Sequence, residues 1–321
     1  LLSTVSEPDA ATLAKLTATV EKNNTANDPA RSSAVPNQIG TTSSKIKHVI
    51  YIVRENRTFD QELGSNGRGN ADPSLNLFGE ESAPNTRALA RQFTTFDNFY
   101  ADAEVSANGW NWVSQANSNP WSEEMWPSNY SGRGAPYPAE NNDPESRAKE
   151  HDSYFWEHLS KNNISFRNYG FYTTLDKKGK AHGVDKKILD PNTDHDFSGW
   201  TLDCPDSARS FAPMAKSCGP KSRVDEWKSD FNKQLAKGSV PTVQLVRFGN
   251  DHTQATKVGV PTPQAYVADN DQAIGQLVET VSHSPIWKDT AIFLTEDDAQ
   301  NGPDHVDAHR TIGEVISPYT R

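Results

Sequence analysis

Two pairs of oxygen-bearing residues follow apolar stretches of this sequence. Glu55 and Asn56 come just after the stretch 45–53, and Asp297 and Asp298 come just after 291–294. Any one of these residues alone could be a helix cap or a solvated loop charge. Three carboxylates that converge with an amide would repel one another without a cation, and such oxygen ligands suit Ca²⁺, Mg²⁺ or Mn²⁺, with Zn²⁺ also possible. The two pairs therefore predict a site for one divalent metal ion.

Two further polar groups contain histidine. The first, 250–252, follows the apolar stretch 242–248 and ends on His252. The second lies in a Gly-Pro loop and contains Asp304, His305, Asp307 and His309. Ligands of open α/β sheets bind beyond the carboxyl ends of the strands, so polar groups placed there are candidate binding residues.

Ser106 is the candidate nucleophile. It precedes a predicted helix that ends at 117, and the amide groups at a helix N-terminus bind anions such as phosphate. A metal ion would lower the pKa of its hydroxyl and hold a substrate oxygen. The alternative is that Ser106 is only the N-cap of this helix, a position at which serine is common.

The two cysteines, Cys204 and Cys218, lie in a segment rich in Pro, Ser, Asp and Gly. Neither has a His or a second Cys at the spacing of a zinc ligand. We expect a disulfide rather than two free thiols, since closing this loop would stabilise the fold by about 3 kcal/mol. A disulfide also favours a location outside the cytoplasm.

The elements that must position these residues alternate between strands and helices. The apolar patterns predict strands at 45–53, 96–100, 165–172, 242–248 and 291–294, and helices at 8–23, up to 117, and at 154–161, 224–235 and 263–282. The first strand is almost continuously β-branched, as in a strand buried on both faces. This order predicts an α/β fold, a three-layer α/β/α sandwich with a mostly parallel central sheet.

Three regions interrupt this alternation. The segment 24–44 is polar and predicts an arm after the first helix, so that 1–44 is a connector and the fold proper covers 45–321. We interpret the segments 121–150 and 173–223 as long loop insertions. They either form the walls of a binding site or are surface loops without such a role. The chain also starts without Met and ends just after an apolar stretch, so we expect an excised piece of a longer polypeptide.

Composition excludes some classes of function. Lys and Arg number 32 and Asp and Glu 42, which gives a net charge of −10 and argues against a nucleic-acid coat protein. The sequence contains no apolar run of the roughly 18 residues that a membrane helix needs.

Three segments resemble the bacterial phosphoesterase family, which includes phospholipases C and a metal-dependent acid phosphatase and belongs to the alkaline phosphatase superfamily. The segments are 46–64 (IKHVIYIVRENRTFDQELG), 247–253 (RFGNDHT) and 293–309 (FLTEDDAQNGPDHVDAH). The resemblance extends over about 45–319 and is strongest to a subgroup with an N-terminal β-propeller, which is absent here. It implies an alkaline phosphatase-like fold, a connector helix at 8–23, and a final strand and helix beyond this sequence.

The resemblance also implies roles for individual residues. Glu55, Asn56, Asp297 and Asp298 match the metal ligands, and Ser106 falls at the nucleophile, although the residues around it depart from the phospholipase pattern. The residues that would bind the phosphate are Asn108, His252, His305 and His309, with His252 and His305 also catalytic. Alternatively, Asp304, His305 and His309, with His252, would hold a second metal ion; we favour one metal ion with histidine donors.

These expectations combine into a metal-dependent phosphomonoesterase that acts on small phosphorylated substrates through a phosphoserine intermediate. One alternative is a phospholipase C or another phosphodiesterase, although no lipid-docking helix is evident. A second alternative, from another class, is a metal-binding surface or interaction module without catalysis.

Overall fold

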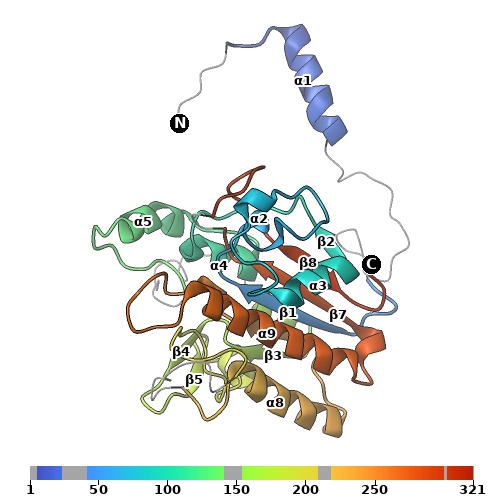
Figure 1. Ribbon diagram of the computed structural model, residues 1–321, viewed down its shortest axis with the longest axis vertical. Coiled ribbons are helices and arrows are strands. Elements are labelled where there is room, and N and C mark those ends of the chain that lie inside the picture. Colours follow the sequence, from blue (N-terminus) through green and yellow to red (C-terminus); the bar gives the residue numbers. More distant parts are fainter. Residues whose placement is uncertain (1–5, 24–41, 141–153, 209–217, 300–301, 321) are drawn as a thin grey trace. The chain divides into compact units, whose positions relative to one another are not determined.

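The first strand, β1 (His48–Arg54), pairs in parallel with β7 (Thr290–Glu296) on one side and with β6 (Val243–Arg247) on the other. The six-stranded sheet has the order β2-β8-β7-β1-β6-β3, where β2 is Thr94–Phe96, β3 Phe166–Tyr169 and β8 Gly313–Ile316. Strand β8 runs antiparallel to both of its neighbours, and the pairs among β7, β1, β6 and β3 are parallel. The sheet is therefore mostly parallel, with its longest strands at the centre (Figure 1).

The computed structural model describes residues 6–23, 42–140, 154–208, 218–299 and 302–320 (Figure 1). The chain divides into two units, Leu1–Ser44 and Lys45–Arg321. In the first unit, helix α1 (Ala10–Asn23) begins two residues later than the sequence predicts, because the Asp9 carboxylate accepts a hydrogen bond from the Thr12 amide and so caps the helix.

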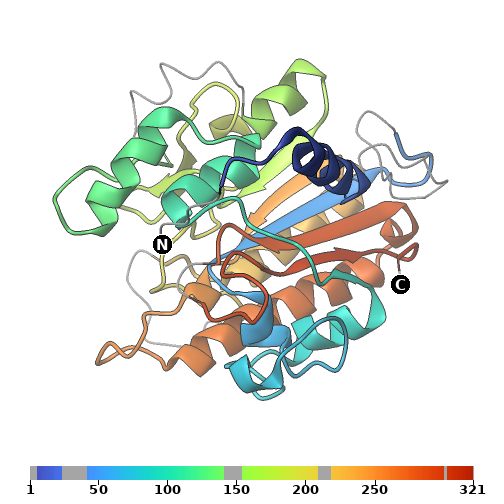
Figure 2. The same cartoon turned by 90° about the horizontal axis from the view of Figure 1, so that it is seen from above.

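Side chains of β1 alternate between two apolar layers, which explains its continuous apolar sequence. Ile50 and Ile52 pack with helices α3 (Pro84–Gln92), α8 (Arg223–Lys237) and α9 (Pro263–Ser282). Tyr51 and Val53 pack on the opposite face with helices α4 (Ser106–Gln115) and α7 (Phe155–Lys161). Helix layers on both faces make the three-layer α/β/α sandwich that the sequence predicts (Figure 2).

The remaining elements are short and lie in the connections. They are α2 (Phe59–Leu63), α5 (Pro120–Tyr130), the two-stranded sheet of β4 (Thr173–Leu175) and β5 (Ala181–Gly183), and the 3-10 helices η2 (Pro73–Leu75), η3 (Asp190–Asn192), η4 (Asn250–His252) and η5 (Trp287–Asp289).

Several element predictions need correction. The strand expected at 96–100 is β2, which ends at Phe96, and Tyr100 forms only an isolated bridge with Arg310. The described part of the segment 121–150 is not all loop, because Asn119 caps helix α5 and Pro120 starts it, whereas 141–150 lies outside the described residues. Strand β3 ends at Tyr169 rather than 172, since Gly170 turns the chain at a φ of 99°.

The expected disulfide between Cys204 and Cys218 is present, and the two Cα atoms are 5.4 Å apart. Among the described residues, none of the helices has the length and apolar character needed to cross a membrane.

Candidate active site

The two predicted pairs of metal ligands, Glu55 with Asn56 and Asp297 with Asp298, contain three carboxylates and are called the acidic pairs. They lie at the carboxyl ends of adjacent parallel strands. Glu55 and Asn56 directly follow β1, and Asp297 and Asp298 directly follow β7. The Asp297 amide donates to the carbonyl of Arg54, the last residue of β1, at 3.0 Å. The parallel pairing of β1 with β7 therefore brings together residues that are more than 200 positions apart in the sequence.

Ser106 and Asn56 both bind Asp298. The Ser106 hydroxyl donates to Oδ2 of Asp298 at 2.9 Å, and Nδ2 of Asn56 donates to the Ser106 oxygen at 2.8 Å. Nδ2 of Asn56 also lies 2.9 Å from both Asp298 oxygens. Ser106 is the first residue of α4, and Val105 is the N-cap. The alternative in which Ser106 only caps the helix is therefore wrong, because its hydroxyl turns to Asp298.

Helix α4 reaches this position because Gly109 has no side chain. A Cβ atom at Gly109 would lie 2.5 Å from the carbonyl oxygen of Asp297, which is closer than real Cβ contacts. The next residue, Trp110, is fully buried and donates its indole N–H to Oε1 of Glu55 at 2.8 Å. The first turns of α4 thus contact both acidic pairs.

Arg247, the last residue of β6, binds two carboxylates of the site. Its Nε donates to Oε1 of Glu55 at 3.0 Å, and its guanidinium also forms an ion pair with Glu140. The guanidinium carbon lies 3.9 Å from the ring centre of Trp110 and 4.6 Å from that of Trp200. Two carboxylates and two indole rings therefore hold Arg247 in place.

Asp297 carries the clearest sign of a missing positive charge. Its Oδ1 accepts the amide of Asp298 at 2.9 Å, whereas the buried Oδ2 has no hydrogen-bond partner among the described residues. Burial raises the pKa of Asp297 well above its usual range, and the charges of Asp298 and Glu55 raise it further, against smaller lowering contributions from the Ser106 hydroxyl and Arg247. A divalent cation between these carboxylates would remove this penalty. The oxygen-rich set of Glu55, Asn56, Asp297 and Asp298 therefore fits a hard divalent metal ion.

Ser106 opens onto a cavity of about 350 Å³. Its lining comprises Glu55, Ser106, Tyr130, Tyr137, Glu140, Thr173, Thr174, Trp200, Arg247 and His252. Burial raises the pKa of the Tyr130 hydroxyl, with added contributions from the charges of Asp298, Asp297 and Glu55, so this phenol stays neutral. The cavity can accept a small anionic group next to the Ser106 hydroxyl.

His252 lies on the wall of this cavity, as the sequence expectation requires of a phosphate-binding residue. Its Nδ1 is 2.8 Å from the carbonyl oxygen of Thr253, so a neutral ring carries its proton on Nδ1. The edge of its ring meets Trp200 at 5.3 Å between centres.

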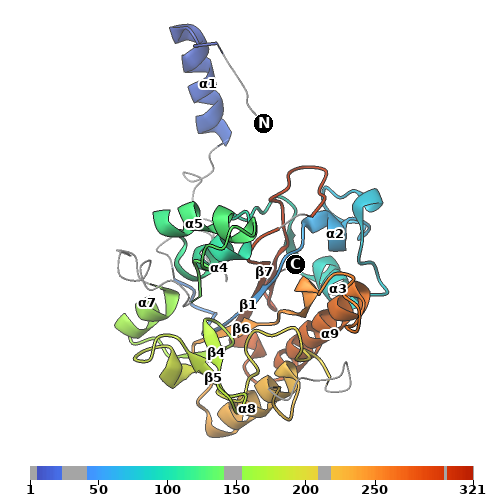
Figure 3. The same ribbon diagram turned by 90° about the vertical axis from the view of Figure 1, so that its left-hand side faces the viewer.

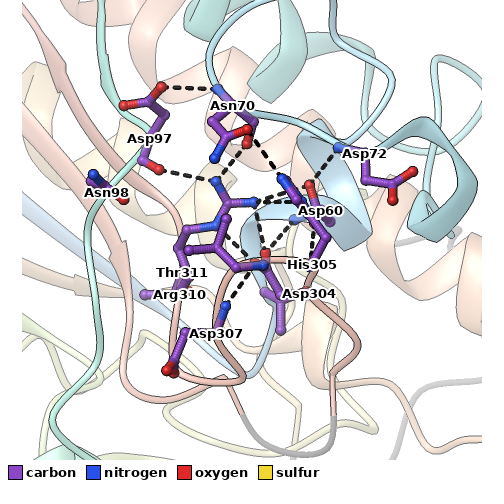
Figure 4. Close-up of polar contacts among 12 residues, drawn as sticks. Asp60, Asn70, Asp72, Asp97, Asn98, Asp304, His305, Asp307, Arg310 and Thr311 are labelled. Carbon is purple, nitrogen blue, oxygen red and sulfur yellow. Dashed lines mark hydrogen bonds and ion pairs between the residues drawn. The ribbon is translucent and has the colours of Figure 1, made fainter.

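His305 and Asp304 lie in a different cluster (Figure 4). Both ring nitrogens of His305 are engaged there, Nδ1 with Asp60 at 2.6 Å and Nε2 with Asn70 at 3.1 Å. The guanidinium of Arg310 donates to Asp304 at 2.9 Å and pairs with Asp60 at 3.1 Å. Asp60, Asp304 and His305 have the spacing of cation ligands, but a buried arginine already supplies the positive charge.

The other two expected phosphate-binding residues are also engaged elsewhere. His309 faces Asp307 and Glu104, both at 3.0 Å, and is not part of the cluster of Asp304 and His305. Burial alone would lower the pKa of His309, but hydrogen bonds to these two carboxylates raise it above its usual value. Asn108 donates to Glu123 and accepts from the Val105 amide, which stabilises the start of α4.

Several residues of the site were missed from the sequence, among them Arg247, Glu140, Gly109 and Trp110. Arg247 stands in a quoted motif, and an arginine at the end of an apolar strand is a usable signal of a buried charge. Gly109 and Trp110 carry no such signal, because their importance depends on the packing of α4 against the sheet.

Comparisons with known proteins show a family and a fold for this chain. A model of the Phosphoesterase family matches residues 66–314, which include Ser106, Asp297 and Asp298 but begin after Glu55 and Asn56. No curated protein sequence matches this chain.

Three solved structures share the fold. A protein of the alkaline phosphatase superfamily from Vibrio parahaemolyticus is 16% identical, with a TM-score of 0.53 over 87% of this chain and 62% of its own. The lipoteichoic acid synthase LtaP from Listeria monocytogenes is 12% identical, with a TM-score of 0.52 over 93% of this chain and 71% of its own. Ps i-CgsB, in complex with k-i-k-neocarrahexaose, is 14% identical, with a TM-score of 0.51 over 85% and 66%. At these identities the likeness shows the fold alone, and this chain spans 62% of the length of the Vibrio protein.

Proposed function

Because this chain belongs to the phosphoesterase family, we propose that it hydrolyses small phosphoric monoesters with a bound divalent metal ion, through a phosphoserine intermediate. The observation that carries the proposal is the Ser106 hydroxyl, which is bound to Asp298 and Asn56 and borders a cavity of about 350 Å³. A serine needed only for structure would not require an acidic pair and a cavity beside it.

Glu55, Asn56, Asp297 and Asp298 would hold the metal ion. When bound, it would supply positive charge that lowers the pKa of the nucleophile and neutralises a phosphate oxygen. The residues themselves have separate tasks. Asp298 accepts the hydroxyl hydrogen of Ser106, and Asn56 donates to the same oxygen, so the nucleophile has one fixed direction. Trp110 and Arg247 keep Glu55 in place.

The chemistry has two steps. The Ser106 hydroxyl gives up its proton as its oxygen bonds to phosphorus, and the ester bond to the leaving alcohol breaks as that alcohol takes up a proton. Water then attacks the phosphoserine, the bond between the Ser106 oxygen and phosphorus breaks, a proton returns to that oxygen, and inorganic phosphate leaves. Arg247 on the cavity wall would donate hydrogen bonds to the transferring phosphoryl oxygens, and His252 would do so only in its imidazolium form, which carries a proton on Nε2 as well.

A phosphodiesterase or phospholipase C is the second candidate. The observation that favours it is the aromatic part of the cavity wall, formed by Tyr130, Tyr137 and Trp200. Rates on p-nitrophenyl phosphate, bis-p-nitrophenyl phosphate and phosphatidylcholine, measured side by side, would rank the three substrate classes. We further propose a location outside the cytoplasm, consistent with the disulfide, and a role for 1–44 as the connector to a β-propeller.

Replacing the nucleophile tests the proposal. Ser106→Ala should lower turnover of p-nitrophenyl phosphate by at least about 10³-fold, since the covalent step is lost, while metal binding survives. Ser114→Ala is the matched control, because Ser114 is a buried serine of the same helix that binds Tyr172 and the Trp110 carbonyl instead. Undiminished hydrolysis by Ser106→Ala would rule out Ser106 as the nucleophile. A wild-type protein that binds metal but hydrolyses no phosphoester would favour the non-catalytic module.

A further inference from the structure

The connection that contains β4 and β5 (Figure 3) carries three side chains with the spacing of cation ligands, outside the site described above. His182 is on β5, Asp190 begins η3, and His195 follows η3. One ligand atom from each residue lies within 4.8 Å of the other two. The three side chains are 34%, 21% and 46% exposed, so an ion in solution can reach them.

His182 is oriented by two carboxylates. Its Nδ1 is 3.5 Å from Oδ1 of Asp190, and its Nε2 is 3.6 Å from Oδ2 of Asp176. A nitrogen and an oxygen that share a tetrahedral zinc ion are about 3.4 Å apart, so His182 and Asp190 already have the separation of two ligands. A histidine that ligates a metal ion through one ring nitrogen commonly has a carboxylate beside its other nitrogen, and this carboxylate fixes the direction of the ring. Asp176 lies at that position beside Nε2 of His182.

His195 supplies the third side chain. Its ring centre is 4.9 Å from that of His182, and its Nδ1 is 4.0 Å from Oδ1 of Asp190. Nδ1 also lies 2.6 Å from the carbonyl oxygen of Ala181, and this hydrogen bond places the proton of a neutral ring on Nδ1. In that tautomer the lone pair is on Nε2, so Nε2 is the nitrogen that His195 would offer to a cation, and the 4.0 Å from Nδ1 to Asp190 describes the nearness of the ring rather than of the ligand atom.

Backbone packing brings Asp190 against β5. A Cβ atom at Gly183 would lie 2.8 Å from the Asp190 nitrogen and 2.9 Å from its Cα, so this approach needs glycine. The Gly183 amide also donates to Oδ1 of Asp190 at 2.8 Å. Two of the three side chains are therefore held at ligand distance by local structure.

We propose that His182, Asp190 and His195 form a second cation site, selective for Zn²⁺, that ties η3 to the β4–β5 hairpin. Two imidazoles and one carboxylate are a zinc donor set, whereas Ca²⁺ and Mg²⁺ prefer oxygen ligands throughout. His182 pairs across the hairpin with Thr174, and Thr173 and Thr174 line the cavity beside Ser106. Zinc at this site would act as a positioning device for one wall of the cavity, without touching the reacting atoms.

Lys186 gives the proposal an independent consequence. Its Nζ lies 3.8 Å from Oδ2 of Asp190, so it competes with a cation for the same carboxylate. Replacing Lys186 with a neutral side chain of similar length should therefore raise the affinity for zinc. Replacing Asp176 should lower that affinity.

The test is a zinc titration in competition with a chromophoric chelator. It uses the full chain with Asp298→Asn, so that the proposed active-site metal does not contribute. We expect one zinc equivalent, bound at least tenfold more weakly after His182→Ala or His195→Ala, about tenfold more weakly after Asp176→Asn, and more tightly after Lys186→Met. His283→Ala, which removes an exposed histidine paired with Glu279, is the control and should bind zinc unchanged.

A second measurement does not depend on any variant's folding. In the wild-type chain with ¹⁵N-labelled histidine, zinc should shift the ring resonances of His182 and His195 and leave those of His283 in place. Unchanged zinc affinity in folded His182→Ala and His195→Ala proteins, or unmoved resonances of these two rings, would overturn the proposal. Neither readout uses phosphatase activity, so a failure of the proposed function is a separate result.

Discussion

Arg247 is the residue where several contacts of the candidate site meet. It is almost completely buried, it binds Glu55 and Glu140, and it lies between Trp110 and Trp200. Burial would lower the pKa of its guanidinium, but the two carboxylates raise it, so Arg247 stays charged. It thus provides a fixed positive charge on the wall of the cavity that Ser106 lines.

We expect Arg247→Lys to lower kcat/KM on p-nitrophenyl phosphate by about 10- to 100-fold, because one ammonium group cannot bridge both carboxylates and stack between two rings. Arg247→Ala should in addition cost about 3 kcal/mol of unfolding free energy, since it leaves the carboxylates of Glu55 and Glu140 without their cation. Steady-state kinetics and urea denaturation measure both effects. Arg167→Lys is the control, as its ion pairs with Asp194 and Asp230 do not line the cavity. Wild-type kinetics in Arg247→Lys would contradict the role given to the guanidinium.

Among the elements, helix α4 decides the position of Ser106, the proposed nucleophile. Its first residue is Ser106, and its second turn lies against the carbonyl of Asp297 at the end of β7. A strand end and a helix start that meet so closely leave no space for a side chain, which is why residue 109 is a glycine.

Gly109→Ala separates helix propensity from this packing. Alanine favours a helix interior over glycine by up to about 1 kcal/mol, yet its Cβ would push α4 away from Asp297. We therefore expect at least a tenfold loss of kcat/KM with little change in helix content by circular dichroism. Gly219→Ala is the control, since its Cβ would lie 3.3 Å from the Asp196 carbonyl oxygen, a contact that a shift of a few tenths of an ångström relieves, against 2.5 Å at Gly109. An active Gly109→Ala enzyme would show that this contact is not needed.

The disulfide in the connection before α8 should stabilise the folded protein. Cys204 and Cys218 are separated by 14 residues, so breaking the bond should lower the free energy of unfolding by about 3 kcal/mol. Urea denaturation with and without dithiothreitol measures this loss. A Cys204→Ala, Cys218→Ala double variant should be insensitive to the reductant, and equal stability of oxidised and reduced wild-type protein would contradict the expectation.

At the scale of the whole molecule, buried carboxyl groups gather beneath the site. Arg54 is fully buried and pairs with Glu62 at 2.9 Å and Glu296 at 2.7 Å. Burial raises the pKa of Glu296 to about 7 and that of Glu314, on β8, to about 8. Both oxygens of Glu314 lack a hydrogen-bond partner among the described residues, and the charged groups that act on it are Arg54, Glu62 and Asp271.

Stability should therefore fall as pH rises. Below about pH 4.5 Glu314 is protonated in both the folded and the unfolded state, so it does not lower the free energy of unfolding. Above that pH only the unfolded state ionises freely, and the free energy of unfolding falls until the pH passes about 8. Glu314→Gln cannot ionise at this position. Relative to the wild type, its free energy of unfolding should therefore increase by up to about 4 kcal/mol between pH 4.5 and 9, which urea denaturation at several pH values measures. Glu279→Gln, at an exposed carboxylate, is the control. A difference that does not change with pH would contradict a neutral Glu314.

The sequence alone determined the layers of the fold and the two acidic pairs. Burial on both faces makes β1 continuously apolar, and polar residues at the end of such a strand stand out, so Glu55, Asn56, Asp297 and Asp298 could be identified. Strand β8 and helix α5 were missed because neither carries a strong periodic pattern. The pattern of apolar residues along a sequence reflects which residues are buried, so buried elements are what this pattern can predict.

Only the tertiary structure decided which polar groups meet. Ser106 binds a residue 192 positions away, and Arg247 reaches Glu55 over the same separation. His305 and His309, adjacent in sequence to the acidic loop, instead face Asp60, Asn70, Asp307 and Glu104. Side-chain direction depends on how α4 packs on the sheet and on where Arg310 is buried, and no spacing along the chain contains that information.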